Sequence, residues 1–242
     1  MRVSGGKAVY GAAVGILMLD ARFPRIPGDM GNATTWPFPV HYRVVREASP
    51  DRVVRHGATG LRDAFIEAAR ALVADGVDGI TTNCGFLSLF QSDLAAAAGV
   101  PVAASSLMQV AMVNRLLPPG RRTGVLTISG STLTPAHLDA AGVPPDTPIG
   151  STEGGREFTR VILDNEPDLD IEAARADNVE AALALCAAHP DLGALVLECT
   201  NMMPYAADIA AATGLPVFTM ESFVCWFHSA LVPRRYPLWV SR

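Results

Sequence analysis

Apolar residues fall along this chain in short continuous runs that alternate with longer segments of helical spacing. In the first half, short apolar runs predict strands at 14–19, 40–45, 79–83 and 101–105. Helical spacing predicts helices at 61–74, 86–98 and 107–116. The second half continues with predicted strands at 125–129, 194–198 and 216–220, and with predicted helices at 134–141, 156–163, 171–188 and 205–212. Such alternation predicts an α/β fold with mainly parallel sheets and right-handed crossovers.

The chain also contains an internal duplication. Residues 84–102, CGFLSLFQSDLAAAAGVPV, align without a gap with residues 199–217, CTNMMPYAADIAAATGLPV. Upstream, GILMLD at 15–20 resembles GVLTIS at 124–129. The recurrence of these segments in the same order indicates a duplication of two halves rather than a many-repeat array.

We therefore predict two pseudo-symmetric lobes, each a mainly parallel sheet flanked by helices, with the active site in the cleft between them. The turn-rich stretch LPPGRRTG separates the halves. We expect an N-terminal lobe at 1–118 and a C-terminal lobe at 119–218. Residues 219–242 are expected to pack back on the N-terminal lobe.

Cys84 and Cys199 occupy matched positions, each after a predicted strand and before a predicted helix. Ligands of open parallel sheets bind beyond the carboxyl ends of the strands, so both thiols are expected at the cleft. Backbone N–H groups and the helix dipole at such positions favour thiolate. A disulfide between the two remains an alternative. Cys186 and Cys225 lie in apolar stretches and are expected to be structural.

Composition narrows the cofactors and partners. The net charge of −5, without a basic block, argues against nucleic acid and anionic membranes, and no apolar run is long enough to span a bilayer. The cysteines lack zinc spacing, so we expect no metal. Lys7 is the only lysine, which argues against pyridoxal phosphate.

The N-terminal segment resembles a signal peptide in its early positive charges and apolar run, but the apolar run is better explained as the first strand. We therefore expect a cytoplasmic enzyme with reduced thiols and no cofactor, which could form a homo-oligomer.

At GILMLD, TTNCG, GVLTISGST and LECTN the chain resembles the Asp/Glu/hydantoin racemase superfamily. The resemblance implies a cofactor-independent racemase or epimerase with one catalytic cysteine in each lobe. Such an enzyme inverts a carbon α to a carboxylate or carbonyl in a small substrate by two-base proton transfer, and the implied acid–base pair is Cys84 and Cys199. Groups that would hold the developing enolate are Asn83, Gly85, Thr200 and Asn201. Further cleft residues implied by the family pattern are Asp20, Ser131 and Thr132, whose alternative role is in turns and caps.

Three features depart from the family pattern. Gly85-Phe86 follows the first cysteine where many of these racemases carry Asn-Thr, and Thr200-Asn201 follows the second where Thr-His or Thr-Glu is common. The long segment 20–39 is typical of a lid or binding loop, or of a subunit contact. Alternative functions are a cis–trans isomerase, an arylmalonate-type decarboxylase and a non-catalytic small-molecule binder. Decarboxylases of the family keep only the second cysteine, so Cys84 argues against that activity.

Overall fold

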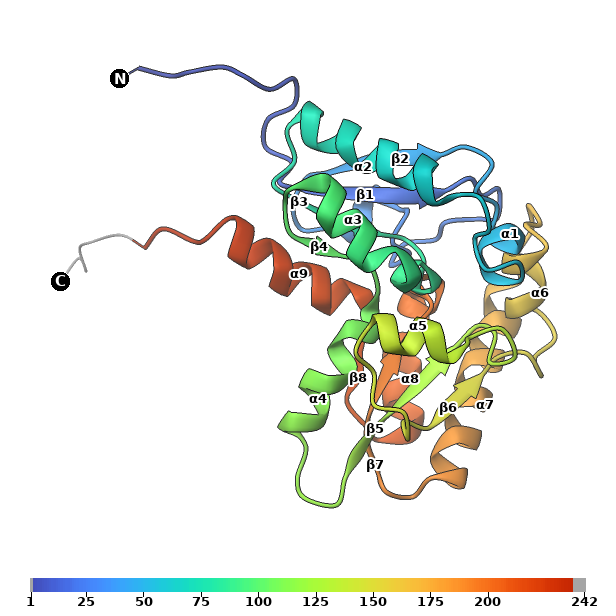
Figure 1. The fold of residues 1–242 in the computed structure, drawn as a ribbon. Coiled ribbons are helices and arrows are strands. Elements are labelled where there is room, and N and C mark those ends of the chain that lie inside the picture. Colours follow the sequence, from blue (N-terminus) through green and yellow to red (C-terminus); the bar gives the residue numbers. More distant parts are fainter. Residues whose placement is uncertain (1, 237–242) are drawn as a thin grey trace.

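The computed structural model describes residues 2–236 and confirms the predicted two-lobe α/β architecture (Figure 1). Each lobe contains a four-stranded parallel sheet. The first has the order β2-β1-β3-β4, formed by β1 (Val14–Leu19), β2 (Val40–Val45), β3 (Gly79–Thr82) and β4 (Val102–Ala103). The second has the order β6-β5-β7-β8, formed by β5 (Arg122–Thr127), β6 (Ile149–Ser151), β7 (Leu192–Leu197) and β8 (Val217–Phe218).

Helices cover both sheets (Figure 1). Those of the first half are η1 (Ala33–Thr35), α1 (Pro50–Val54), α2 (Arg62–Asp75), η2 (Gly85–Phe90), α3 (Gln91–Ala98), η3 (Ser106–Gln109) and α4 (Val110–Leu116), where η marks a 3₁₀ helix. Those of the second half are α5 (Pro135–Ala140), α6 (Phe158–Leu163), α7 (Ile171–Ala188), η4 (Thr200–Tyr205), α8 (Ala206–Thr213) and α9 (Met220–Leu231).

The duplication seen in the sequence is also present in the geometry. The succession η2–α3–β4 recurs as η4–α8–β8, and the matched elements begin and end at aligned residues. The helices α3 and α8 both end at a glycine in the left-handed region, Gly99 with φ 68° and Gly214 with φ 69°. Only glycine adopts this conformation without a steric cost, which accounts for its presence at both helix ends.

Five elements were absent from the expectations, namely η1, α1, β6, η4 and α9. The helix α1 has five residues, which is too short for apolar spacing to reveal, although Ser49 caps it and Pro50 follows that cap. The strand β6 has three residues with Gly150 at its centre, where a Cβ atom would lie 3.0 Å from the Leu185 side chain of α7. In addition, the predicted helix 86–98 begins with the 3₁₀ turns of η2.

One apolar core extends through both lobes and includes the central strands β1, β3, β5 and β7. A second, smaller cluster covers the other face of the first sheet. There Val14 and Ile16 pack with Phe223 and Phe227 of α9 and with Trp36. The helix α9 thus follows the second lobe in sequence but packs on the first, beside β3 (Figure 1). Of the C-terminal segment 219–242, residues 237–242 lie outside the described part.

The segment 20–39 is held within the chain. The indole Nε1 of Trp36 donates hydrogen bonds to the Met30 carbonyl and to the Tyr42 hydroxyl. At Gly28, with φ 94°, a Cβ atom would lie 3.1 Å from the Cα atom of Pro204 in η4. This segment of the first lobe therefore packs directly against the second.

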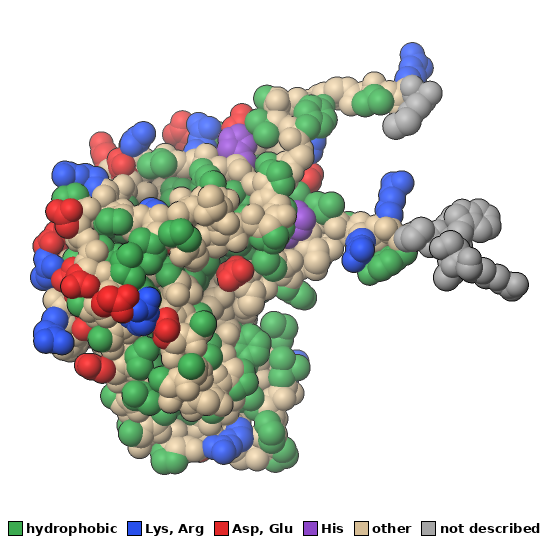
Figure 2. All heavy atoms as spheres, turned by 180° about the vertical axis from the view of Figure 1, so that it is seen from behind, with side chains coloured by type: hydrophobic (Ala, Val, Ile, Leu, Met, Phe, Trp, Pro, Cys, Tyr) green, Lys and Arg blue, Asp and Glu red, His purple; other side chains and the backbone are tan. Residues whose placement is uncertain are grey.

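Acidic and basic side chains are intermixed on the face drawn in Figure 2, without a continuous basic patch. Within residues 2–236, no helix combines the length and apolar character that crossing a membrane requires. The same residues contain no group of three His, Cys, Asp or Glu side chains arranged to hold a metal ion.

Candidate active site

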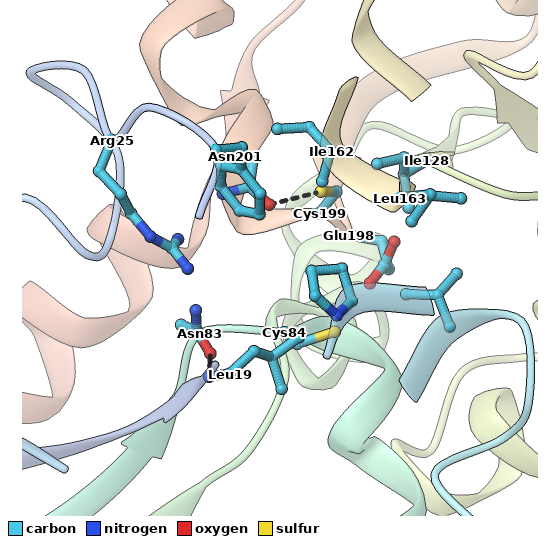
Figure 3. A pocket seen from close by; sticks show the side chains of 13 residues that line it. Leu19, Arg25, Asn83, Cys84, Ile128, Ile162, Leu163, Glu198, Cys199 and Asn201 are labelled. Carbon is cyan, nitrogen blue, oxygen red and sulfur yellow. Dashed lines mark hydrogen bonds between the residues drawn. The ribbon is translucent and has the colours of Figure 1, made fainter. Parts of the chain in front are cut away.

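Cys84 and Cys199 line one pocket, which is formed by both lobes (Figure 3). The cavity that they line is small, about 20 Å³, and both thiols are largely covered, with 8% and 6% of their residue surface exposed. In Figure 3 the two sulfur atoms lie on facing walls. The residues that line the pocket are Leu19, Phe23, Arg25, Pro50, Val54, Asn83, Cys84, Ile128, Ile162, Leu163, Glu198, Cys199 and Asn201.

The two cysteine loops are fixed to each other by hydrogen bonds between the lobes. The Thr200 hydroxyl donates to the Asn83 carbonyl at 2.6 Å. The Ser106 hydroxyl, at the start of η3, donates to the Leu197 carbonyl at the end of β7, also at 2.6 Å. All of these groups are buried. The pocket walls are therefore set by the packing of the lobes and not by flexible loops alone.

Burial works against the thiolate form that the helix starts were expected to favour. Burial raises the pKa of Cys84 and of Cys199, and the nearby Glu198 carboxylate raises both further. Backbone N–H groups after each cysteine lower the pKa, as the sequence suggested, but by less than burial raises it. All four cysteines are free thiols, so no disulfide joins this pair.

The two thiols have different neighbours. The pKa of Cys84 is lowered by the charge of Arg25 and by the backbone N–H groups of Phe86 and Leu87. The thiol of Cys199 instead donates a hydrogen bond to the Asn201 side-chain oxygen, with a sulfur–oxygen distance of 3.5 Å. Burial raises the pKa of both thiols, but Cys84 has more groups that oppose this effect, and the proton of Cys199 is held by Asn201.

Glu198 is a pocket residue that the sequence analysis did not single out. It ends the apolar run of β7, is fully buried, and accepts a hydrogen bond from the Thr127 hydroxyl at 2.7 Å through Oε2. Its other carboxylate oxygen, Oε1, is buried without a hydrogen-bond partner. Burial raises the pKa of Glu198 to about 7, against smaller lowering by hydrogen bonds from Thr127 and Ile128. An acid directly before a cysteine, at the end of an otherwise apolar strand, was the available signal.

Arg25 is the second residue that sequence reasoning missed. Its Nη1 donates to Asp29 Oδ1 at 2.9 Å, and the second oxygen of Asp29 accepts from Asn201 Nδ2 at 2.6 Å. Nη2 of Arg25 is buried and has no hydrogen-bond partner in the protein. The long segment 20–39 thus supplies an ordered cation to the pocket, attached through Asp29 to the loop of the second cysteine.

Of the residues implied by the family resemblance, Asn83 and Asn201 line the pocket with the two cysteines. Gly85 and Thr200 lie behind it: a Cβ atom on Gly85 would be 2.2 Å from Glu198 Oε1, and the Thr200 hydroxyl is used between the lobes. Neither lines the pocket.

Asp20, Ser131 and Thr132 are not brought to the two cysteines. Asp20 forms an ion pair with Arg46 at the surface. The hydroxyls of Ser131 and Thr132 belong to a polar cluster around Ser129 and Glu153, in which the Glu153 carboxylate accepts from Ser129 Oγ at 2.7 Å. Their roles in this structure are those of local turn and loop contacts.

No protein-family model matches the chain. Among curated proteins, it is 29% identical over 215 residues to a dimethylsulfoniopropionate lyase of Durusdinium sp. clade D, covering 86% of this chain and 71% of that protein. It is 30% identical over 233 residues to dimethylsulfoniopropionate lyase 5 of Emiliania huxleyi (strain CCMP1516), covering 90% of this chain. The chain spans about half the length of that second relative, 45% of it.

Solved structures of similar architecture include arylmalonate decarboxylase and amino-acid racemases. A mutant of arylmalonate decarboxylase superimposes with a TM-score of 0.60 at 17% identity, covering 95% of this chain and 97% of that one. A glutamate racemase of Bacillus anthracis gives a TM-score of 0.59 at 15% identity, covering 91% of this chain and 84% of the racemase. At these identities the likeness concerns the fold, and the comparisons leave the class of reaction open.

Proposed function

We propose that this chain, which has the fold of the Asp/Glu/hydantoin racemase superfamily, is an enzyme that removes the proton α to a carboxylate without a cofactor. The observation that carries the proposal is the convergence of two thiols, one from each lobe, on a pocket that also contains Arg25. A carbon acid needs a base at the carbon and fixed positive or donor groups at the carboxylate, where charge develops.

Arg25 and Asn83 are the groups that would hold the substrate carboxylate. The free Nη2 of Arg25 is a buried donor without a partner, and a carboxylate is the acceptor that best fits a guanidinium. Asn83 accepts from the Leu19 N–H through Oδ1, which leaves its NH₂ group to donate, and Figure 3 shows this nitrogen on the pocket side. Both donors would gain strength as the enolate forms in a site from which water is largely excluded.

Cys84 would act as the base. Arg25 and two backbone N–H groups favour its thiolate, whereas the proton of Cys199 is held by Asn201. A carboxylate substrate bound at Arg25 would place its α-carbon beside the two sulfur atoms. The proton passes from this carbon to the Cys84 sulfur, and the electron pair moves into the carboxylate as an enolate.

The following step is proposed to be β-elimination from a sulfoniopropionate. Two curated relatives bear the name dimethylsulfoniopropionate lyase, and the pocket beyond the thiols is walled by Ile128, Ile162 and Leu163. The enolate electron pair forms the carbon–carbon double bond, the carbon–sulfur bond breaks, and dimethyl sulfide and acrylate result. The sulfide leaves as a neutral molecule and requires no proton donor, and Cys84 returns its proton to solvent.

Racemisation is the second candidate, because Cys199 lies on the wall that faces Cys84. A thiol in that position could deliver a proton to the opposite face of the carbon and invert it. A substrate without a leaving group on the β-carbon would follow this course. Both candidates begin with the same proton removal and differ only in what the enolate does next.

One experiment separates the two candidates. The protein is incubated in D₂O with dimethylsulfoniopropionate, and separately with L-aspartate and L-glutamate, and the reactions are followed by proton NMR. The proposed lyase forms acrylate and dimethyl sulfide, and this reaction disappears in the Cys84→Ala variant. A racemase instead exchanges the α-proton of an amino acid without releasing a fragment. Absence of both reactions would refute proton removal from these substrates.

A further inference from the structure

The Glu198 carboxylate is the most unusual group in the pocket, because one of its oxygens is buried without a partner. Oε2 accepts a hydrogen bond from the Thr127 hydroxyl, whereas Oε1 accepts none. Oε1 instead packs against Gly85, the glycine that follows Cys84 in the first lobe. Within residues 2–236, no Lys, Arg or His nitrogen forms an ion pair with this carboxylate. Burying an uncompensated carboxylate costs several kcal/mol, so a group kept in this state calls for a partner that binds later.

Glu198 lies at one end of the pocket and Arg25 at the other. In Figure 3 the two side chains are on opposite sides of the two sulfur atoms, and Arg25 is beside Asn83 and Asn201. The lining near Glu198 is formed by carbon atoms, principally of Ile128 and Leu163. The pocket therefore has a cationic end, a central pair of thiols, and an apolar end that contains a single acid.

We infer that Glu198 is the specificity-determining counter-ion for a permanent cation on the substrate, so that the site takes a small onium carboxylate. The carboxylate of this molecule lies at Arg25, and its sulfonium or quaternary ammonium group lies at Glu198. The inference rests on the proposed function, because it takes Arg25 as the anchor of the substrate carboxylate. It adds the residue that selects the cationic end of such a substrate, and it extends the ligands that the site should bind to quaternary ammonium carboxylates.

The surroundings of Glu198 fit an onium group and not a primary ammonium group. An –NH₃⁺ group carries three N–H donors and needs several acceptors, but this end of the pocket offers one free oxygen amid hydrocarbon. A sulfonium or quaternary ammonium ion has no N–H donor and presents methyl groups. These pack on Ile128, Ile162 and Leu163 while the positive charge lies near the Glu198 carboxylate.

Binding of a cation at Glu198 would also assist the thiol chemistry. The negative charge of Glu198 raises the pKa of both Cys84 and Cys199 in the ligand-free protein. A bound onium ion cancels this charge and so lowers the free energy of forming the Cys84 thiolate. An uncharged substrate of the same shape gives no such assistance.

The test is a binding measurement that does not depend on turnover. The probe is 3-(trimethylammonio)propionate, a betaine with a poor leaving group, and the comparison ligand is 4,4-dimethylpentanoate, its isostere with a carbon atom in place of the cationic nitrogen. Affinities are measured by calorimetry for the unmodified protein, for Glu198→Gln, and for Glu180→Gln as a control. Glu180 is an exposed acid of α7, so its variant removes one charge without altering the pocket.

We expect the unmodified protein and Glu180→Gln to bind the betaine at least about tenfold more tightly than the isostere. In Glu198→Gln the betaine loses at least about tenfold in affinity, and the isostere changes by less than about threefold. Since the pKa of Glu198 is raised to about 7, the affinity of the unmodified protein for the betaine should also rise between pH 6 and pH 8. The titratable or charged groups that share the pocket are Cys84 and Cys199, whose pKa values are raised above this range, and Arg25.

Equal affinity for the two ligands in the unmodified protein would overturn the assignment. An equal loss of affinity for both ligands in Glu198→Gln would also overturn it, because it would show that Glu198 has a purely structural role. The pH arm uses only the unmodified protein and so remains decisive if the variant folds poorly; an affinity independent of pH contradicts the inference. Charge discrimination without turnover of dimethylsulfoniopropionate would support the onium site and refute the proposed elimination.

Discussion

The residues before the two cysteines show how the lobes have diverged. Asn83 and Glu198 occupy matched positions, and each accepts a hydrogen bond from the end of the first strand of its lobe. Asn83 Oδ1 accepts from the Leu19 N–H at 2.8 Å, and Glu198 Oε2 accepts from the Thr127 hydroxyl at 2.7 Å. The scaffold is the same, but one lobe places a neutral amide in the pocket and the other places an acid.

The residues after the cysteines differ in a complementary way. Gly85 in the first lobe leaves the space that the Glu198 carboxylate occupies, and Thr200 in the second lobe reaches across to the Asn83 carbonyl. Asn201, which departs from the pattern expected after the second cysteine, also contacts the first lobe, where its Nδ2 donates to Asp29. The duplicated framework preserves the position of the thiols, and the asymmetry around them determines the chemistry available to each.

The largest expected effect concerns the thiols themselves. Cys84→Ala should reduce the rate of elimination by about 10³-fold or more, because it removes the base, whereas Cys199→Ala should cost about tenfold to a hundredfold. The measurement is kcat/KM for acrylate release by each variant. Cys186→Ala and Cys225→Ala serve as controls, since neither residue lines the pocket, and should retain nearly full activity.

Equal and complete loss in the two pocket variants would instead indicate that both thiols exchange protons, as a racemase requires. Full turnover in Cys84→Ala would contradict the assignment of the base.

The next effect is on stability and depends on pH. The pKa of Glu198 is raised from 4.5 to about 7 in the folded protein, so the folded state holds this proton more tightly than the unfolded state. Stability from this group is present below pH 4.5 and is lost as the pH rises through 7. Between pH 4.5 and pH 8, the unfolding free energy of the unmodified protein should fall by about 3 kcal/mol relative to Glu198→Gln.

Urea denaturation of both proteins across this pH range checks the prediction, with Glu180→Gln as a surface control that should follow the unmodified protein. Parallel profiles for Glu198→Gln and the unmodified protein would show that Glu198 does not titrate in this window.

The smallest effect concerns the contact between the lobes. Thr200→Val keeps the shape of the side chain but removes the hydroxyl that donates to the Asn83 carbonyl, leaving that buried acceptor without this bond. We expect a loss of about 1–2 kcal/mol in unfolding free energy. Thr213→Val is the matched control, because it removes a hydroxyl whose hydrogen bonds are local, one donated to the Ile209 carbonyl and one accepted from the Leu215 N–H. Equal losses of unfolding free energy in the two variants would mean that the hydrogen bond between the lobes stabilises the protein no more than a local one does.

Much of the fold could be predicted from the sequence because it depends on apolar spacing and on the repeat. The gap-free match of residues 84–102 with 199–217 corresponds to aligned helices and strands in the structure. The two-lobe fold that the resemblance implied is confirmed, since solved structures of arylmalonate decarboxylase and glutamate racemase share it. The same alignment predicted that Cys84 and Cys199 lie at one cleft, since matched strand ends in a two-lobe fold meet there.

The chemistry around the thiols could not be predicted in the same way. Arg25 lies in an irregular segment without periodicity, and only tertiary packing brings it to the pocket. Glu198 ends an apolar strand, where an acid is usually solvated, and its burial depends on Gly85 of the other lobe. The pKa of the thiols could not be predicted for the same reason, because the sequence indicates the helix starts but not the burial that outweighs them.

A crystal structure with 3-(trimethylammonio)propionate bound would show directly how such a substrate lies between the two lobes. We expect its carboxylate to contact Arg25 and Asn83, its trimethylammonio group to lie against Glu198, and the carbon next to the carboxylate to lie between the sulfur atoms of Cys84 and Cys199. A ligand bound in the reverse orientation, or with that carbon out of reach of Cys84, would contradict this expectation.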